Sequence, residues 1–141
     1  MENDKKIWKK MYILWLGLLL AALLMFYNNQ PIFKDYAEKS TAYTVREASQ
    51  EGVQYACFEI VNAKIGESCS LAAEDFSLAE CIKYFQAEII FTETAGSVTN
   101  YYLYSPVIRR TKTLRGEKIN LHVAFDNGRV VMGSPLIYGG Y

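Results

Sequence analysis

The first thirty residues contain the longest uninterrupted run of apolar positions in the chain. Residues 11–27 read MYILWLGLLLAALLMFY and carry no charge, whereas four lysines lie within residues 1–10. A helix rises about 1.5 Å per residue, so this run and its flank to residue 30 match a bilayer core about 30 Å thick. The pattern predicts a transmembrane signal-anchor helix over residues 11–30, preceded by a basic cytoplasmic stub over residues 1–10.

A cleaved signal peptide would show the same order of charge and apolar residues. Its apolar run would be shorter, and a small-x-small cleavage site would follow it. The exit sequence here is LLMFYNNQP, which has no such site. We therefore expect an uncleaved, single-pass protein of the cell membrane, with its N-terminus in the cytoplasm and its C-terminal domain outside.

Residues 31–52 form the next segment, in which charged residues recur at nearly every turn. Pro31 ends the spanning helix, and a thin apolar stripe at helical spacing follows it. The stripe predicts a short juxtamembrane helix, with a solvated linker as the alternative. Gly52 marks the start of the extracytoplasmic domain, residues 53–141. The stripe consists of Ile32, Phe33, Tyr36, Ala37 and Tyr43.

The pattern in residues 53–141 changes from strand to helix and back to strand. Residues 54–65 alternate and then change phase, as in a bulged strand. Residues 71–85 place apolar side chains on one helical face. Four further strands are predicted, and Asp126-Asn127-Gly128 predicts a tight hairpin between the last two. We expect an α+β fold, an antiparallel sheet with a helix packed on one face. The four strands are 88–94, 99–108, 118–125 and 129–137.

Charge limits the classes of partner. The chain has 15 basic and 15 acidic residues, so no global field attracts polyanions. The densest basic stretch, residues 109–118, lies near several tyrosines. Basic side chains that pair with phosphates, together with tyrosines that stack on bases, can bind single-stranded nucleic acid. A solvated loop is the favoured interpretation, and an anionic envelope polymer or lipid headgroup is the functional alternative. The candidate binding residues are Arg109, Arg110, Lys112, Arg115, Tyr101, Tyr102 and Tyr104.

Three cysteines, Cys57, Cys69 and Cys81, permit one disulfide in three pairings and leave one thiol over. An extracytoplasmic location permits such a bridge, although buried thiols acting as small apolar residues are the favoured interpretation. The spacing matches no zinc pattern, and the single histidine, His122, falls on the polar face of a strand, where we expect it to be solvated. The sequence predicts no metal, no cofactor and no enzyme.

The tail KINLHVAFDNGRVVMGSPLIYGGY resembles the C-terminal end of the YwmB-like family, bacterial proteins of undetermined function with an exported or anchored N-terminus. A Lys-hydrophobic-Asn-hydrophobic strand leads through a turn to a hydrophobic-Gly-Ser-Pro-hydrophobic strand and a final tyrosine. The resemblance implies a fold similar to that of TATA-box-binding proteins, and this chain has room for about one such unit. The matching positions are Lys118, Asn120, Leu121, Ala124, Gly133, Ser134, Pro135 and Tyr141.

A single unit of that fold exposes a sheet edge and an apolar surface, which a second copy or an envelope protein would cover. We therefore expect a membrane-anchored extracytoplasmic domain that works by binding or assembly, without catalysis. The alternative is a nucleic-acid-binding domain that uses residues 109–118. The domain is predicted to lie outside the cytoplasm, and the chain after residue 10 is slightly acidic. Both points disfavour nucleic acid as the ligand.

Overall fold

The computed structural model describes residues 2–28, 30–40, 43–50, 54–55, 58–59 and 63–137. The chain divides into two compact units, Met1–Gln30 and Pro31–Tyr141. The first unit is a helix, and the second is an antiparallel sheet with helices.

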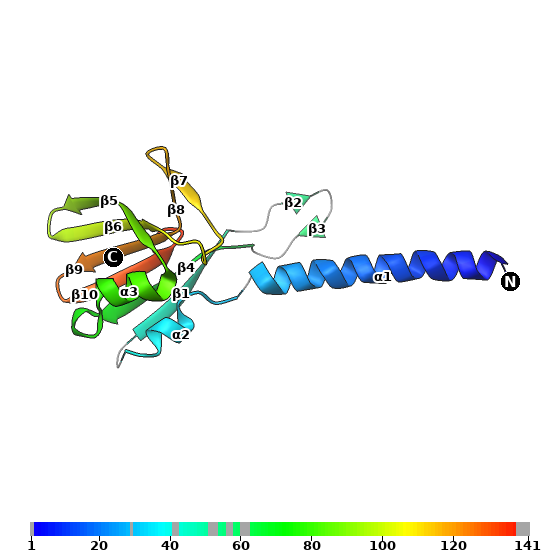
Figure 1. The fold of residues 1–141 in the computed structure, drawn as a ribbon, viewed down its shortest axis with the longest axis horizontal. Coiled ribbons are helices and arrows are strands. Elements are labelled where there is room, and N and C mark those ends of the chain that lie inside the picture. Colours follow the sequence, from blue (N-terminus) through cyan, green and yellow to red (C-terminus); the bar gives the residue numbers. More distant parts are fainter. Residues whose placement is uncertain are drawn as a thin grey trace. The chain divides into compact units, whose positions relative to one another are not determined.

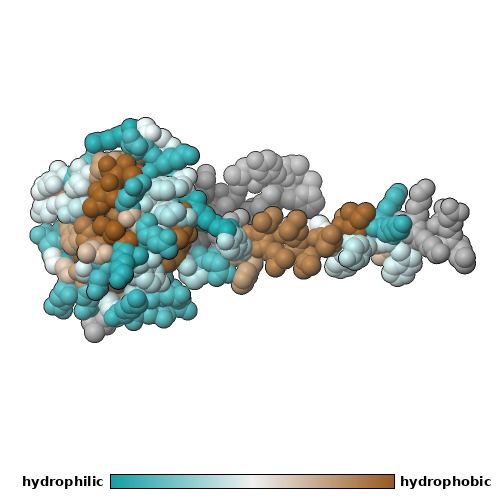
Figure 2. Space-filling model, in the orientation of Figure 1, coloured by the Kyte–Doolittle hydropathy of each residue, from teal (hydrophilic) through white to brown (hydrophobic). Residues whose placement is uncertain are grey.

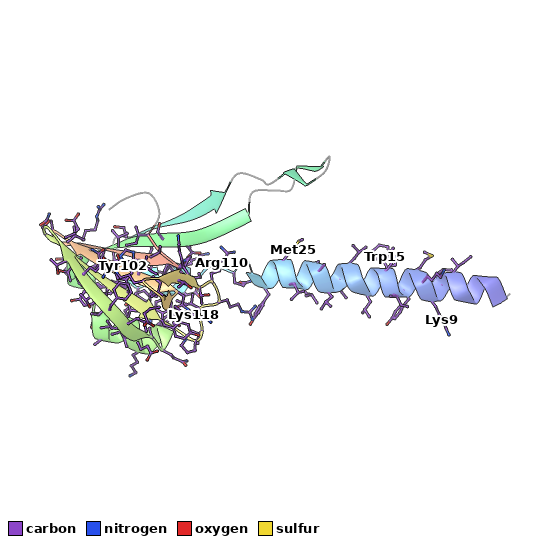
Figure 3. The ribbon with its side chains drawn as sticks, turned by 90° about the horizontal axis from the view of Figure 1, so that it is seen from above. Lys9, Trp15, Met25, Tyr102, Arg110 and Lys118 are labelled. Carbon is purple, nitrogen blue, oxygen red and sulfur yellow. The ribbon has the colours of Figure 1, made fainter. Side chains whose placement is uncertain are left out.

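The first unit is the helix α1 (Glu2–Asn28), and its stretch Ile7–Tyr27 is long and apolar enough to cross a membrane. Its 21 residues extend over about 31 Å. No part of this stretch is buried, and Trp8 and Phe26 are 70% and 71% exposed. Side chains point outward all round the helix (Figure 3). The predicted apolar helix is confirmed, and its apolar surface begins four residues before the predicted residue 11.

The second unit is built on a six-stranded sheet in the order β1-β4-β10-β9-β6-β5, in which every neighbouring pair is antiparallel (Figure 1). Two short hairpins lie outside this sheet, β2 (Gln54–Tyr55) with β3 (Phe58–Glu59) and β7 (Lys112–Leu114) with β8 (Glu117–Ile119). The strands of the main sheet are β1 (Tyr43–Gln50), β4 (Ala63–Ala72), β5 (Glu88–Ala95), β6 (Val98–Tyr104), β9 (Leu121–Asp126) and β10 (Arg129–Ser134).

Helices cover one face of this sheet. They are α2 (Lys34–Ala37), a 3-10 turn η1 (Ala73–Asp75) and α3 (Leu78–Phe85). The Ser77 hydroxyl accepts a hydrogen bond from the Glu80 amide at the start of α3, and Gln86 ends the helix with a left-handed φ of 50°. Cys81 and Phe85 on the inner side of α3 belong to the same core as the buried apolar residues of β4, β6, β9 and β10. The predicted α+β fold, an antiparallel sheet with a helix on one face, is confirmed at this level.

The segment predicted as a juxtamembrane helix, with a linker as the alternative, contains the short helix α2. It belongs to the second unit, which begins at Pro31 and not at the expected residue 53. Phe33 is fully buried, and its ring meets that of Phe85 edge to face at 5.9 Å. The buried Glu67 carboxylate accepts the backbone N–H of Phe33 at 2.7 Å and that of Ile32 at 3.1 Å. Residues 43–50 then form β1, an edge strand paired with β4. Phe33, Tyr36 and Ala37 of the apolar stripe are therefore part of the core, and Ile32 packs against it.

Two further predictions within residues 54–85 are wrong. The described residues of the range 54–65 are not one bulged strand, because β2 and β3 pair with each other and β4 begins separately at Ala63. The predicted helix over 71–85 begins at Leu78, because Leu71 continues β4 with its side chain in the core. Apolar residues that alternate in a strand and apolar residues on a helix face both fit this short stretch, so its periodicity alone does not separate them.

The predicted strands 88–94, 99–108 and 129–137 are confirmed as β5, β6 and β10 with shifts in their ends. The predicted strand 118–125 is wrong as one strand, because Asn120 separates β8, which pairs with β7, from β9 in the main sheet. Asn127 and Gly128 adopt positive φ angles of 41° and 84° in the hairpin between β9 and β10, as the sequence predicts. Strand β6 ends at Tyr104, just before Ser105-Pro106, and β10 ends at Ser134, just before Pro135. The two Ser-Pro pairs therefore mark strand ends, where proline has no N–H for the ladder.

Candidate functional site

The tyrosines predicted to bind do not form one surface. The Tyr101 ring packs against Phe125 on the helix-covered face, at 5.6 Å between centroids. Tyr102 points to the opposite face, where its ring stacks between Phe91 at 4.5 Å and His122 at 4.4 Å. Tyr102 is only 8% exposed. Both faces of this ring are occupied, so neither is open for stacking on a base.

The predicted basic loop is largely the β7–β8 hairpin. Arg115 lies at its turn with a φ of 55°, followed by Gly116 with a φ of 85°. The Arg115 guanidinium forms an ion pair with Glu93 of β5 and lies 5.4 Å from the centre of the Phe91 ring. Of the seven candidate residues, the structure brings Arg115 and Tyr102 to the same small cluster around these two side chains. Arg109 and Arg110 precede the hairpin, Lys112 begins β7, and Tyr104 ends β6.

His122 is buried on this opposite face and is 4% exposed, so the expectation of a solvated histidine is wrong. Its Nδ1 accepts the backbone N–H of Ile137 at 3.4 Å, which places the ring proton on Nε2, 2.9 Å from the Asn100 side-chain oxygen. Burial lowers the pKa of His122 to about 4. The imidazole is therefore neutral and enclosed near pH 7.

Residues 136 and 137 contribute to this burial, together with the stacked Tyr102 ring. A Cβ atom at Gly133 would collide with the backbone of Leu136 and Ile137, so these residues fold back directly over the end of β10. Gly133 pairs with His122 in the sheet. Glycine at this position thus permits the close approach that encloses the histidine.

Asn120 of the family-like motif is also structural. Its side-chain oxygen accepts the Ser105 backbone N–H at 2.7 Å, and its amide donates to the carbonyls of Ser105 and Ile108 at 2.6 and 2.7 Å. Asn120 is fully buried. These bonds hold the turn that follows β6 against the start of β9. The role of Asn120 in this motif is therefore to stabilise the fold.

Cys69 and Cys81 are buried free thiols. The Cys81 sulfur lies 3.8 Å from that of Met132, and burial raises the pKa of the Cys81 thiol to about 12. Burial likewise raises the pKa of Cys69. Both groups are protonated at neutral pH and are poor nucleophiles. Cys57, the third residue of the possible disulfide, lies outside the described residues.

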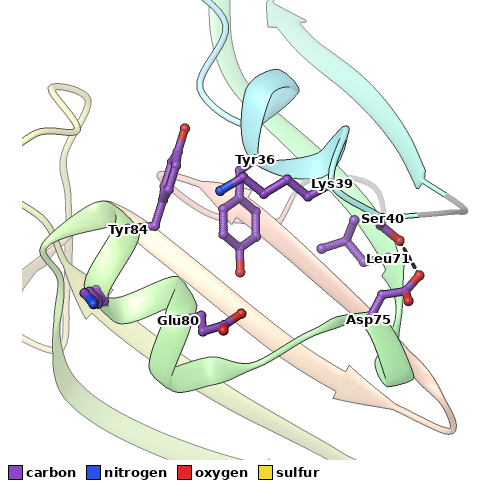
Figure 4. Close-up of a pocket in the computed structure, with 8 residues that line it drawn as sticks. Tyr36, Lys39, Ser40, Leu71, Asp75, Glu80 and Tyr84 are labelled. Carbon is purple, nitrogen blue, oxygen red and sulfur yellow. Dashed lines mark hydrogen bonds between the residues drawn. The ribbon is translucent and has the colours of Figure 1, made fainter.

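A cleft of about 440 Å³ opens on the helix-covered face between α2, η1, α3 and β4 (Figure 4). The rings of Tyr36 and Tyr84 meet at one side of it, with centroids 5.0 Å apart. The Lys39 ammonium lies 4.8 Å from the centre of the Tyr84 ring and 5.9 Å from that of Tyr36. The cleft is lined by Tyr36, Lys39, Ser40, Leu71, Asp75, Glu80, Lys83 and Tyr84.

The charges around this cleft are of both signs and differ in how they are used. Asp75 accepts a hydrogen bond from the Ser40 hydroxyl at 2.7 Å. Among the residues that the structure describes, Lys39, Lys83 and Glu80 take part in no ion pair. Burial and the adjoining Cys81 raise the pKa of Tyr36, so its hydroxyl stays neutral. The cleft thus combines an aromatic wall with charges that are open to a ligand.

Sequence reasoning missed this cleft, although two signals for it are present. Tyr36 belongs to the apolar stripe of the expected juxtamembrane helix, and Glu80, Lys83 and Tyr84 lie on the outer side of the helix that follows Ser77. Neither signal tells which helix meets which. In the described part of the chain, no group of three or more His, Cys, Asp or Glu side chains is placed to hold a metal ion.

Comparisons with known proteins do not assign the chain to a family: no family model, no curated protein and no solved structure matches it. The resemblance to the YwmB-like family over residues 118–141, and the TATA-box-binding-protein-like fold that it implies, stay predictions. The expected homodimer or envelope partner also stays a prediction. Strands β1 and β5 are the two edges of the sheet, and Ile89 of β5 is 43% exposed.

Proposed function

We propose that this chain is a single-pass membrane protein whose second unit acts as a binding module at the outer surface of the cell membrane. The observation that carries the proposal is the stretch Ile7–Tyr27 of α1, of which nothing is buried. Full burial of one large apolar side chain is worth roughly 1.5–3 kcal/mol. The apolar surface of α1, which is brown over much of its length in Figure 2, gains no such free energy of burial in water. In a bilayer the same side chains would be buried among lipid tails and would gain it.

The charge distribution supports the orientation. Lys5, Lys6, Lys9 and Lys10 precede the apolar stretch, and a lysine-rich flank favours the cytoplasmic side of the membrane. The second unit would then lie outside the cytoplasm. This location separates it from chromosomal nucleic acid, and the enclosed Tyr102 ring is a second argument against base stacking.

Binding without catalysis is the activity that the described side chains support best. General acid–base catalysis needs a group near its pKa in contact with substrate, and nucleophilic catalysis needs an activated thiolate or hydroxyl. His122 is enclosed and neutral, and Cys69 and Cys81 are buried thiols. The cleft between α2 and α3, in contrast, offers aromatic and charged groups to a ligand.

Reporter fusions after Tyr141 test the proposal. One reporter is active only outside the cytoplasm, and the other is fluorescent only inside it. We expect activity outside, together with a protein that stays in the membrane after an alkaline wash and has the mass of the uncleaved chain. A Leu19→Lys, Leu20→Lys double variant should be lost from the membrane, whereas Lys34→Gln should be retained. Fluorescence inside, or a mass that lacks α1, would contradict the anchor or its orientation.

A further inference from the structure

The lining of the cleft between α2 and α3 selects for a particular charge pattern. Two ammonium groups, Lys39 after α2 and Lys83 on α3, come from separate elements and line the same cleft. The Lys39 ammonium is oriented by the rings of Tyr36 and Tyr84, over which it lies. A phosphate or carboxylate in the cleft would receive charge-assisted hydrogen bonds from these two groups.

A carboxylate of the same cleft calls for the opposite charge. Glu80 projects from α3 on the side of Tyr36, as Figure 4 shows. Asp75 already accepts the Ser40 hydroxyl, whereas Glu80 is one of the charged groups without an ion pair among the described residues. An ammonium group in the cleft would meet this carboxylate and donate a charge-assisted hydrogen bond to it.

We propose that this cleft binds a small zwitterion in which an anionic phosphate or carboxylate and a primary ammonium group are a few bonds apart. A simple anion would be repelled by the Glu80 carboxylate, and a simple cation would be repelled by the ammonium groups of Lys39 and Lys83. A zwitterion matches both signs. The volume of about 440 Å³ lies within the range of about 300–1,000 Å³ that is usual for small-molecule sites.

Phosphoethanolamine has this chemistry and occurs both as a lipid headgroup and as a soluble group. Tyr36 follows Tyr27, the last residue of the apolar stretch, by only nine positions in the chain. A lipid source therefore agrees with the proposed function, on which the biological setting of this inference rests. The charge selectivity of the cleft does not depend on the orientation of the protein in the membrane.

Titration calorimetry on the full chain in nonionic detergent micelles tests the charge selectivity. Phosphoethanolamine, inorganic phosphate and ethanolamine are titrated separately. We expect phosphoethanolamine to bind at least about tenfold more tightly than either of the other two, because it alone satisfies both signs of charge. Equal affinity for inorganic phosphate, equal affinity for ethanolamine, or no heat from any of the three would overturn the proposal.

Three variants assign the contacts. Glu80→Gln should weaken phosphoethanolamine binding about tenfold and leave phosphate binding unchanged or tighter, whereas Lys39→Gln should weaken both. Lys34→Gln is the matched control, because this lysine pairs with Glu38 and does not line the cleft. Amide NMR spectra establish that each variant is folded. If Lys34→Gln weakened binding as much as Lys39→Gln, the effect would be one of general charge and the proposal would fail.

Doping the micelles with phosphatidylethanolamine distinguishes the two sources. Competition with soluble phosphoethanolamine identifies a lipid headgroup as the ligand, and unchanged affinity identifies a soluble or polymer-bound one. The reporter fusions separate this inference from the proposed function. Selective binding with a reporter inside the cytoplasm would retain the ligand class and reject the location, whereas a reporter outside without selective binding would reject the ligand class alone.

Discussion

The burial of His122 predicts a loss of stability in mild acid. The folded chain holds this side chain neutral, with a pKa of about 4 in place of 6.5, because burial disfavours the imidazolium. Protonation would also remove the acceptor that Nδ1 offers to the Ile137 N–H. The unfolded chain exposes the ring and takes up the proton first as the pH falls.

The sign and size of the effect follow from this difference in pKa. A folded pKa below the unfolded value contributes no pH dependence above about 6.5, and stability declines as the pH falls from 6.5 to about 4. Each unit of difference is worth about 1.4 kcal/mol, so the loss reaches about 3 kcal/mol at pH 4. Between pH 7.5 and pH 4.5 the expected loss is about 2.5 kcal/mol.

The assay benefits from the presence of a single histidine in the chain. NMR of the imidazole in untagged protein reports its pKa directly, in the folded chain and in urea. Urea unfolding of the wild type and of His122→Gln at pH 7.5 and 4.5 gives the free energies. Carboxylates titrate in both proteins, so their contribution cancels in the difference between wild type and variant. An imidazole that titrates near 6.5 in the folded chain, or an equal pH dependence in the two proteins, would refute the reasoning.

Three substitutions test other parts of the fold by urea unfolding, with the exposed Glu117→Gln as a control expected to stay within about 0.5 kcal/mol of wild type. Asn120→Ala should cost about 2–4 kcal/mol, because it leaves buried backbone groups of the turn after β6 without partners. Gly133→Ala should cost about 1–3 kcal/mol, since the added Cβ collides with the backbone that folds over β10. Glu67→Gln should cost about 1–3 kcal/mol, because its neutral amide accepts the two backbone N–H groups less strongly. A cost no greater than that of the control would show that the contact in question is not formed.

Local signals account for the parts of the fold that the sequence predicts well. The hairpin at Asp126-Asn127-Gly128 depends on residues that tolerate positive φ, and the strands on either side of it alternate strictly. The apolar length of α1 is a property of one segment. The start of the second unit is different, because Phe33 is held by Glu67, which lies 34 residues further along the chain. No local sequence pattern at residues 31–40 predicts that contact.

The candidate site shows the same limit. Alternation correctly separates His122 from the core side chains of β9, but it does not tell whether the other face of the sheet is covered. Part of the cover comes from residues 136–137, whose close approach requires glycine at position 133. Likewise, Lys39 and Lys83 lie 44 positions apart in sequence, and the packing of α2 beside α3 decides that they share a cleft.

The same packing makes the cleft conditional on the docking of residues 31–40. Tyr36 and Lys39 reach the cleft while the segment is docked, and the Glu67 carboxylate contributes to docking by accepting the two backbone N–H groups that precede α2. Ligand binding and docking of this segment are therefore one equilibrium, and a ligand that needs the docked form stabilises it by RT ln(1 + [L]/Kd). It follows that Glu67→Gln should weaken ligand binding without any contact to the ligand, because the apparent Kd is the intrinsic Kd divided by the fraction of molecules in which the segment is docked.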